Sequence, residues 1–81
     1  MKANIYIKYK EGILDPQGAT VSHALESMNV KNIDSLTIGK FIEMNFTKVS
    51  KEEASAIADE SCRKLLANPN IETYEFEIVE K

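Results

Sequence analysis

The sequence has few of the residues that form cross-links or bind anions. Its 81 residues include one cysteine, Cys62, and one arginine, Arg63. A single cysteine cannot form an internal disulfide, and no Cys or His residues have the spacing of metal ligands. Ten Lys and Arg against thirteen Asp and Glu give a net charge of −3. Because nucleic-acid affinity comes mainly from clustered Lys and Arg, this balance argues against nucleic acid as a partner.

Long apolar runs are also lacking. The longest run is a few residues, whereas a membrane-spanning helix needs about 20, and the first residues lead into a strand-like alternation instead of an apolar signal core. With three Gly and two Pro in 81 residues, there is no room for a linker and a second domain. We expect a single domain at 1–81, soluble and cytoplasmic, of a size at which a partner often adds stability.

The first half of the chain contains one predicted strand and one predicted helix. Apolar and polar side chains alternate through 2–10, which predicts a half-buried strand. Asp15 can cap a helix whose first residue is Pro16, because proline has no N–H to leave unpaired there. Apolar residues then recur at helical spacing, and Asn29 is a typical helix end. A helix is therefore expected from Pro16 to about Met28.

The second half contains a predicted helix followed by a strand. Ser50 and Glu53 have the spacing of a capping box, in which each residue accepts a hydrogen bond from the backbone of the other. Apolar residues line one side of the helix that follows, as far as about Leu66. The breaker Asn68-Pro69-Asn70 ends it, and apolar residues then alternate with polar ones in a last strand.

Between the helices, residues 33–47 have a strand-like pattern interrupted by Gly39-Lys40, which predicts a turn between two antiparallel strands. The element order β-α-β-β-α-β then indicates an α+β, ferredoxin-like fold. In this fold two helices cover one face of a four-stranded antiparallel sheet. The other face, with Tyr6 and Phe41, is expected to meet solvent or another subunit.

A cysteine nucleophile with a histidine base is the first catalytic arrangement to consider. Such a thiol must be exposed and have a lowered pKa. Cys62 instead lies in the apolar stripe of the second helix, and His23 points away from the apolar stripe of the first. The two side chains are not expected to meet, so we predict a buried structural thiol and a solvated imidazole.

The remaining charged residues are typical of solvated helix faces and strand edges. Asp59–Arg63 and Glu60–Lys64 have the i,i+4 spacing of weak ion pairs. An acyl-phosphatase of this fold needs an arginine after the first strand, and a metal carrier needs a Cys-x-x-Cys loop; neither is present. We therefore predict no catalytic, cofactor-binding or metal-binding residue.

The loop at 12–18 is the segment that these arguments do not explain. Ile13 and Leu14 are apolar residues in a loop, and Gly18 weakens a helix start by about 1 kcal/mol relative to alanine. The two apolar side chains either dock onto another chain or fold back to close the core. The sequence alone leaves both alternatives open.

At this point the residues show a resemblance to a known family. The whole chain resembles PurS, the small subunit of phosphoribosylformylglycinamidine synthase. The motifs that carry the resemblance are Gly12-Ile13-Leu14-Asp15-Pro16-Gln17-Gly18, Ala24-Leu25, Ile38-Gly39-Lys40, Ile42-Glu43-Met44, Cys62, Leu65-Leu66-Ala67-Asn68-Pro69, Ile71-Glu72 and Tyr74. Met28-Asn29 and Thr37 depart from the family pattern, so no partner role is assigned to Thr37.

The resemblance implies a homodimer, with a tetramer as the alternative, that joins a large synthetase subunit, PurL, to a glutaminase subunit, PurQ. Their complex makes formylglycinamidine ribonucleotide, glutamate, ADP and phosphate from formylglycinamide ribonucleotide, glutamine and ATP. ATP and Mg are then expected on the synthetase, the thiol nucleophile on the glutaminase, and no cofactor on this chain. Its role would be to align the two subunits so that ammonia passes between them without loss to water.

We expect partner contacts from the loop before the first helix and from the Gly-Lys bend. The residues are Leu14, Asp15, Pro16, Gln17, Gly39 and Lys40. The alternative to an assembly subunit is a small-ligand-sensing regulatory domain, which needs a glycine-lined pocket between the first strand and the first helix. Gly12 and Gly18 are compatible with that alternative.

Overall fold

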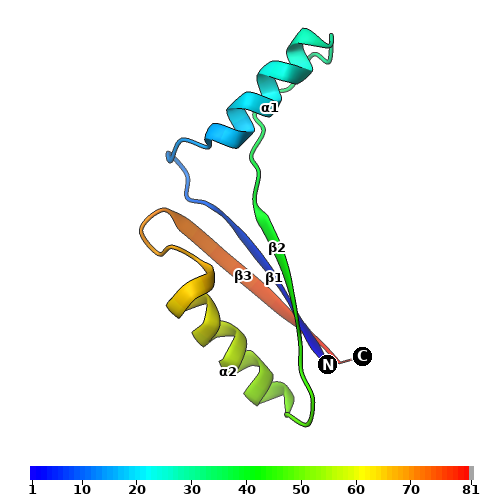
Figure 1. Ribbon diagram of the computed structural model, residues 1–81, viewed down its shortest axis with the longest axis vertical. Helices are drawn as coiled ribbons and strands as arrows, with labels where there is room; N and C mark the ends of the chain where they lie inside the picture. Colours follow the sequence, from blue (N-terminus) through cyan, green and yellow to red (C-terminus); the bar gives the residue numbers. More distant parts are fainter. Residues whose placement is uncertain (81) are drawn as a thin grey trace.

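The computed structural model describes residues 1–80. These residues form two α-helices, a short π-helical segment that follows the second helix, and three strands (Figure 1). In chain order the elements are β1 (Lys2–Tyr9), α1 (Pro16–Ser27), β2 (Lys40–Asn45), α2 (Lys51–Ser61), η1 (Cys62–Leu66) and β3 (Glu72–Val79). Both strands at the chain ends and both helices lie within a few residues of their predicted positions. None of the helices in this described part combines the length and apolar character needed to cross a membrane.

The three strands form one antiparallel sheet in the order β2-β1-β3. In the register, Ile5 lies opposite Ile42 on one side and Phe76 on the other. Alternate residues of β1 point to the same face, and Ala3, Ile5 and Ile7 are buried there. This face, which we call the inner face, therefore holds the core.

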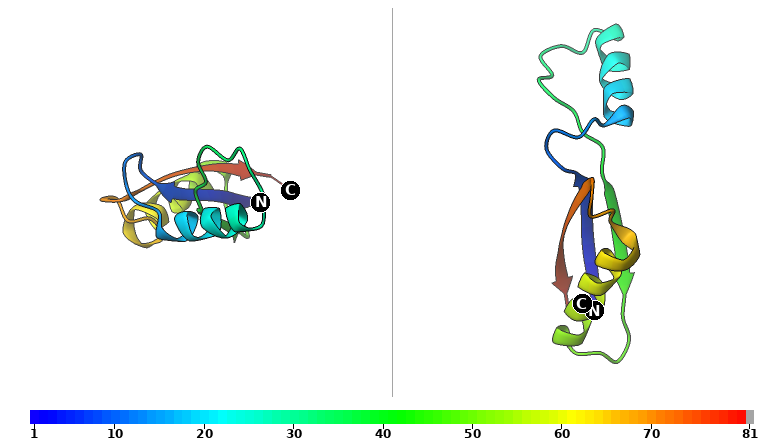
Figure 2. Two further views of the ribbon diagram at one scale, coloured as in Figure 1. Left: turned by 90° about the horizontal axis from the view of Figure 1, so that it is seen from above. Right: turned by 90° about the vertical axis from the view of Figure 1, so that its left-hand side faces the viewer.

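Helix α2 covers the inner face (Figure 2). It begins at the predicted capping box: Ser50 Oγ accepts from the Glu53 N–H at 3.1 Å, and Glu53 Oε1 accepts from the Ser50 N–H at 3.0 Å. Ala54, Ala58 and Cys62 follow at helical spacing and are fully buried. The prediction of a helix from the capping box into η1 is confirmed.

Helix α1 does not share this position, and the expectation that both helices cover one face of the sheet is wrong. Figure 1 shows α1 beyond the end of the sheet, joined to it by the segment that follows β1 and by the segment that leads into β2. The molecule measures 50 × 28 × 15 Å. Its radius of gyration is 16.1 Å, whereas a compact domain of this length has about 12 Å. We call residues 13–38, which comprise α1 and its flanking segments, the arm.

The hairpin predicted at Gly39-Lys40 is also wrong. Residues 28–39 are outside any strand, and the chain runs from the arm directly into β2 at Lys40 (Figure 1). The described residues therefore form three strands instead of four. Gly39 lets the backbone of the returning segment lie close to β1 and does not form a turn. A Cβ at this position would lie 2.5 Å from the carbonyl oxygen of Ile7.

Candidate functional site

Cys62 and His23, which we weighed as a catalytic pair, lie on different parts of the molecule. Cys62 is fully buried in the core, as predicted, and its burial, followed by the nearby Asp59 carboxylate, raises the pKa of the thiol. A raised pKa disfavours the reactive thiolate. His23 is exposed on α1, within the arm. Residues 1–80 contain no cluster of three or more His, Cys, Asp or Glu that could hold a metal ion.

Asp15 joins the two segments of the arm, the start of α1 and the segment that returns to the sheet. It is 8% exposed; its Oδ1 accepts from the Gly18 N–H at 2.9 Å and its Oδ2 from the Ile38 N–H at 2.7 Å. The first bond is the predicted helix cap. The second joins the start of α1 to the segment that returns to the sheet. The Ile38 N–H, followed by that of Gly18, lowers the pKa of the Asp15 carboxyl.

Gly18 is explained by the same arrangement. A Cβ on Gly18 would lie 2.6 Å from the carbonyl oxygen of Leu36 and 2.7 Å from Asp15 Oδ2. Only glycine lets the returning segment lie this close to the first turn of α1. Because the chain itself fills this space, Gly18 does not line the pocket that a small-ligand sensor would need.

The two segments predicted to contact partners are adjacent in the structure. Gln17 lines one small depression together with Gly39 and Lys40. The Lys40 ammonium lies 3.8 Å from the Glu72 carboxylate, at the edge of the same depression. The Asp15–Ile38 hydrogen bond accounts for this proximity, since it draws the residues before Gly39 to the start of α1. Neither sequence spacing nor composition could have revealed this bond.

The arm exposes apolar side chains that a monomer leaves uncovered. Leu14 and Met28 are 78% and 71% exposed, and Val21 and Val30 are about two-fifths exposed. Leu14 does not fold back to close the core, which was one of the two alternatives left open by the sequence. The apolar stripe expected on α1 is present, but no pattern in the sequence indicates that this chain leaves it without a cover.

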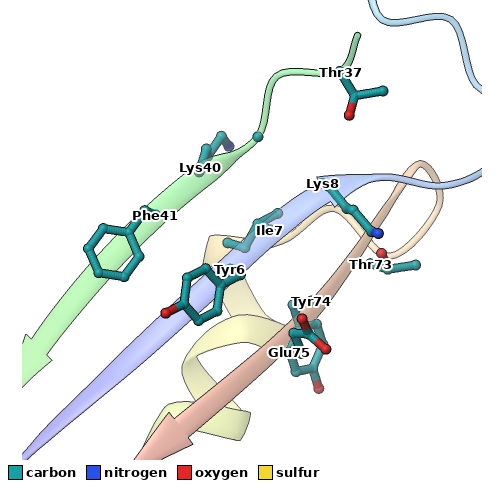
Figure 3. Close-up of a pocket in the computed structure, with 10 residues that line it drawn as sticks. Tyr6, Ile7, Lys8, Thr37, Lys40, Phe41, Thr73, Tyr74 and Glu75 are labelled. Atoms are coloured by element: carbon teal, nitrogen blue, oxygen red, sulfur yellow. The ribbon is translucent and has the colours of Figure 1, made fainter. Parts of the chain in front are cut away.

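The outer face of the sheet exposes an aromatic pair. Tyr6 on β1 lies opposite Phe41 on β2, and their rings stack with centroids 5.2 Å apart (Figure 3). Tyr6 Oη donates to Glu77 Oε2 at 3.1 Å, and Lys2 forms a 2.8 Å ion pair with Glu43 on the same face. The prediction that Tyr6 and Phe41 lie on the face opposite the helix is confirmed.

Ion pairs on α2 and η1 agree with the spacing seen in the sequence. Arg63 Nε lies 2.8 Å from Asp59 Oδ2, and Lys64 pairs with Glu60 at 2.8 Å. Asp59 has a further role that the sequence did not indicate: it accepts from Tyr74 Oη at 2.7 Å and so links the helix to β3. This hydrogen bond, followed by that from Arg63, lowers the pKa of Asp59.

Comparison with known proteins identifies the family of this chain. Residues 2–80 match the family described as PurS: phosphoribosylformylglycinamidine (FGAM) synthase. The phosphoribosylformylglycinamidine synthase subunit PurS of Bacillus subtilis is 42% identical over 79 residues, which cover 98% of this chain and 93% of that one. The PurS subunit of Methanocaldococcus jannaschii is 35% identical over 77 residues, which cover 95% of this chain and 93% of that one.

Solved structures give the same result. The chain resembles Bacillus subtilis PurS with a TM-score of 0.86 at 42% identity, covering 98% of each chain. It resembles a chain of the PurLQS structure from Thermotoga maritima with a TM-score of 0.85 at 31% identity, covering 96% of this chain and 95% of that one. The chain belongs to the PurS family, whose members are subunits of the ligase FGAM synthase.

Proposed function

We propose that this chain is a non-catalytic assembly subunit of phosphoribosylformylglycinamidine synthase in de novo purine biosynthesis, acting in the cytoplasm. The observation that carries the proposal is its full-length similarity to a chain of the PurLQS structure from Thermotoga maritima. In this role it bridges a PurL synthetase, which holds ATP and Mg, and a PurQ glutaminase, which releases ammonia. The chain positions the two partners so that ammonia is transferred without loss to water.

We propose that the partner contacts of this chain lie where the arm meets the sheet, with Gln17, Gly39 and Lys40 around one small depression. The residues are Leu14, Asp15, Pro16, Gln17, Gly39 and Lys40. Leu14 supplies an exposed apolar side chain, and Lys40 supplies a positive charge close to Gln17. Asp15 acts from within, because its buried carboxylate holds the two segments together.

Reconstitution tests this function. Purified PurL and PurQ should carry out glutamine-dependent FGAM synthesis only when this chain is added. Ammonia supplied directly should restore synthesis without it, because only the transfer between the two active sites is lost. Glutamine-dependent turnover that is undiminished without this chain would refute the assembly role. If ammonia fails to restore synthesis, the chain acts on the synthetase itself and the proposed transfer role is wrong.

The proposed subunit is a homodimer in which each arm covers the partner's sheet. Helix α2 packs on β1 and β3, so the inner face of β2 lacks a cover, and Ile42 and Met44 are only partly buried there. The apolar stripe of α1 lacks a cover as well, with Val21 and Met28 exposed. Burying both surfaces against each other releases about 25 cal/mol for each Å² of apolar area. A second copy offers both complementary surfaces at once.

A pair of substitutions on α1 tests the dimer. Val21→Asp places a charge in the apolar stripe, whereas His23→Asp places the same side chain on an exposed position of the same helix. Light scattering should give a dimer mass for the wild type and the His23→Asp variant and a monomer mass for Val21→Asp. A dimer mass for Val21→Asp would show that the stripe is not the interface.

A further inference from the structure

Strand β2 lies at one edge of the sheet, and alternate backbone N–H groups of this strand point to the open side. The order β2-β1-β3 leaves that side of β2 without a neighbour within residues 1–80. Phe46, the residue after β2, donates its N–H to the carbonyl oxygen of Met1 at 2.9 Å. N–H groups alternate in direction along a strand, so the even-numbered residues of β2 point theirs to β1. The N–H groups of Phe41 and Glu43 therefore point away from β1.

The segment before β2 has N–H groups that point to the same open side. Residues 33–39 belong to no helix or strand, and the chain runs from them into β2 without a turn (Figure 1). The N–H of Ile38 points to the same side as those of β2 that pair with β1, and there it donates to Asp15 Oδ2 at 2.7 Å. By the same alternation the N–H groups of Ser35 and Thr37 point to the open side, and neither forms a hydrogen bond within residues 1–80.

The side chains of this segment alternate as those of a strand do. Leu36 and Ile38 are partly buried, whereas Ser35 and Thr37 are exposed. Ile38 and Val21 line the same depression between the segment and α1. Figure 2 shows α1 on the same side of the extended chain as α2. The apolar side of the segment therefore faces in the same direction as the inner face of the sheet, and it carries α1 as that face carries α2.

We propose that residues 33–38 of one copy pair antiparallel with the open edge of β2 in a second copy, an inference that rests on the homodimer proposed above. Each sheet then gains its fourth strand from the partner copy. Segment and strand form one extended run, 33–45, and two such runs lie antiparallel about a two-fold axis near Gly39. The N–H groups that point to the open side in one run donate to carbonyl oxygens of the other.

A second copy fits this edge because it satisfies two unpaired rows of backbone groups at once. A strand from a larger subunit would pair with β2 but would leave Ser35 and Thr37 without partners. The exchange also brings α1, which lies over the segment, across the inner face of the partner's β2, where Ile42 and Met44 are only partly buried. Backbone pairing and apolar burial then occur in one continuous interface. The strand-like pattern of residues 33–38 has its explanation in the same pairing.

Amide hydrogen exchange, measured for each residue by NMR, tests the pairing in the intact protein. The protein is held at a concentration at which light scattering gives a dimer mass. The amides of Thr37, Phe41 and Glu43 should then exchange at least about a hundredfold more slowly than unprotected amides. The matched controls are Tyr74 and Phe76, whose N–H groups point to the open edge of β3 by the same alternation. These two amides should exchange close to the unprotected rate.

A pair of proline substitutions tests the backbone of the segment separately. Thr37→Pro removes an N–H on the open side. Asp34→Pro makes the same kind of change at an exposed position of the same segment, but the N–H that it removes points to the other side. Thr37→Pro should raise the dissociation constant of the dimer by about tenfold or more, and Asp34→Pro should leave it within about threefold of the wild type. Analytical ultracentrifugation measures both constants.

Three outcomes would overturn the exchange of strands. A dimer in which Phe41 and Glu43 exchange as fast as Phe76 would refute the strand pairing and leave the assembly function intact. Protection that arises only after PurL or PurQ is added would assign the edge of β2 to a larger subunit. A wild type that stays monomeric would refute the proposed dimer together with this inference. Failure of the assembly function is a separate result, because reconstituted turnover measures it.

Discussion

At the scale of single residues, Asp15 determines the shape of the arm. One carboxylate caps α1 through Gly18 and also holds the returning segment through Ile38. The cap could be read from Asp15-Pro16 because it lies within a few residues of sequence. The bond to Ile38 spans 23 residues, and no local pattern encodes it. A single side chain thereby brings the loop before α1 next to Gly39-Lys40.

Asp15→Asn should make the protein less stable at neutral pH, by several degrees in melting temperature, because the two N–H groups meet different carboxylate oxygens and the amide places an NH2 donor against one of them. The folded pKa of Asp15 is lowered, so its contribution is fully present well above the ordinary pKa of about 3.9. That contribution is lost as the pH falls through the folded pKa. The difference in melting temperature between wild type and variant should therefore shrink on acidification. A constant difference from pH 7 to pH 3 would contradict this account.

Gly39→Ala should destabilise the protein, because the added methyl group would meet the carbonyl oxygen of Ile7 at 2.5 Å. Backbone atoms of a central strand cannot move aside as a flexible side chain can, so we expect a loss of about 1–3 kcal/mol in the free energy of unfolding. Chemical denaturation measures this loss. An unchanged unfolding midpoint would show that β2 can shift away from β1 at little cost.

At the scale of elements, the sequence predicted what local patterns encode and missed the path of the chain between the two helices. Strands β1 and β3 follow from alternation, and α2 follows from its capping box, because these signals lie within each element. The prediction of a hairpin at Gly39 was wrong because a strand-like pattern around glycine is equally compatible with a tight turn and with an extended segment. The predicted position of α1 was wrong because its apolar stripe indicates that the helix packs against another surface but not where that surface lies.

Ser50→Ala should weaken α2 at its start. The substitution removes the oxygen that accepts from the Glu53 N–H, and loss of such a cap costs about 1 kcal/mol in the free energy of unfolding. Ser55→Ala is the matched control, because it makes the same change inside the helix, where alanine is the better helix former. Urea denaturation should place the control at or above the wild type and Ser50→Ala below it. Equal midpoints for the two variants would mean that the cap does not limit stability.

At the scale of the whole molecule, the elongated shape separates the surfaces by task. The arm and the inner face carry the apolar side chains, and the outer face carries the exposed, stacked pair Tyr6 and Phe41. Alternation in β1 predicted the exposure of Tyr6, and the sequence also placed Phe41 correctly. The acceptors around them could not be predicted, since Glu75, Glu77 and Asn4 meet only through the pairing of β1 with β3.

The proposed exchange of arms also predicts how the stability of the molecule depends on its concentration. Folding and association are coupled when each arm completes the core of its partner, so dilution favours the unfolded chains. Each tenfold dilution removes about 1.4 kcal/mol from the free energy of unfolding of the dimer, or about 3–5 °C in melting temperature for a dimer of this size. Calorimetry over a hundredfold range of concentration measures this slope. The His23→Asp variant should keep the slope, while Val21→Asp, which places a charge in the interface, should melt lower and without it. A wild-type melting temperature that does not change with concentration would mean that the elongated chain, with its radius of gyration of 16.1 Å, is stable without a second chain.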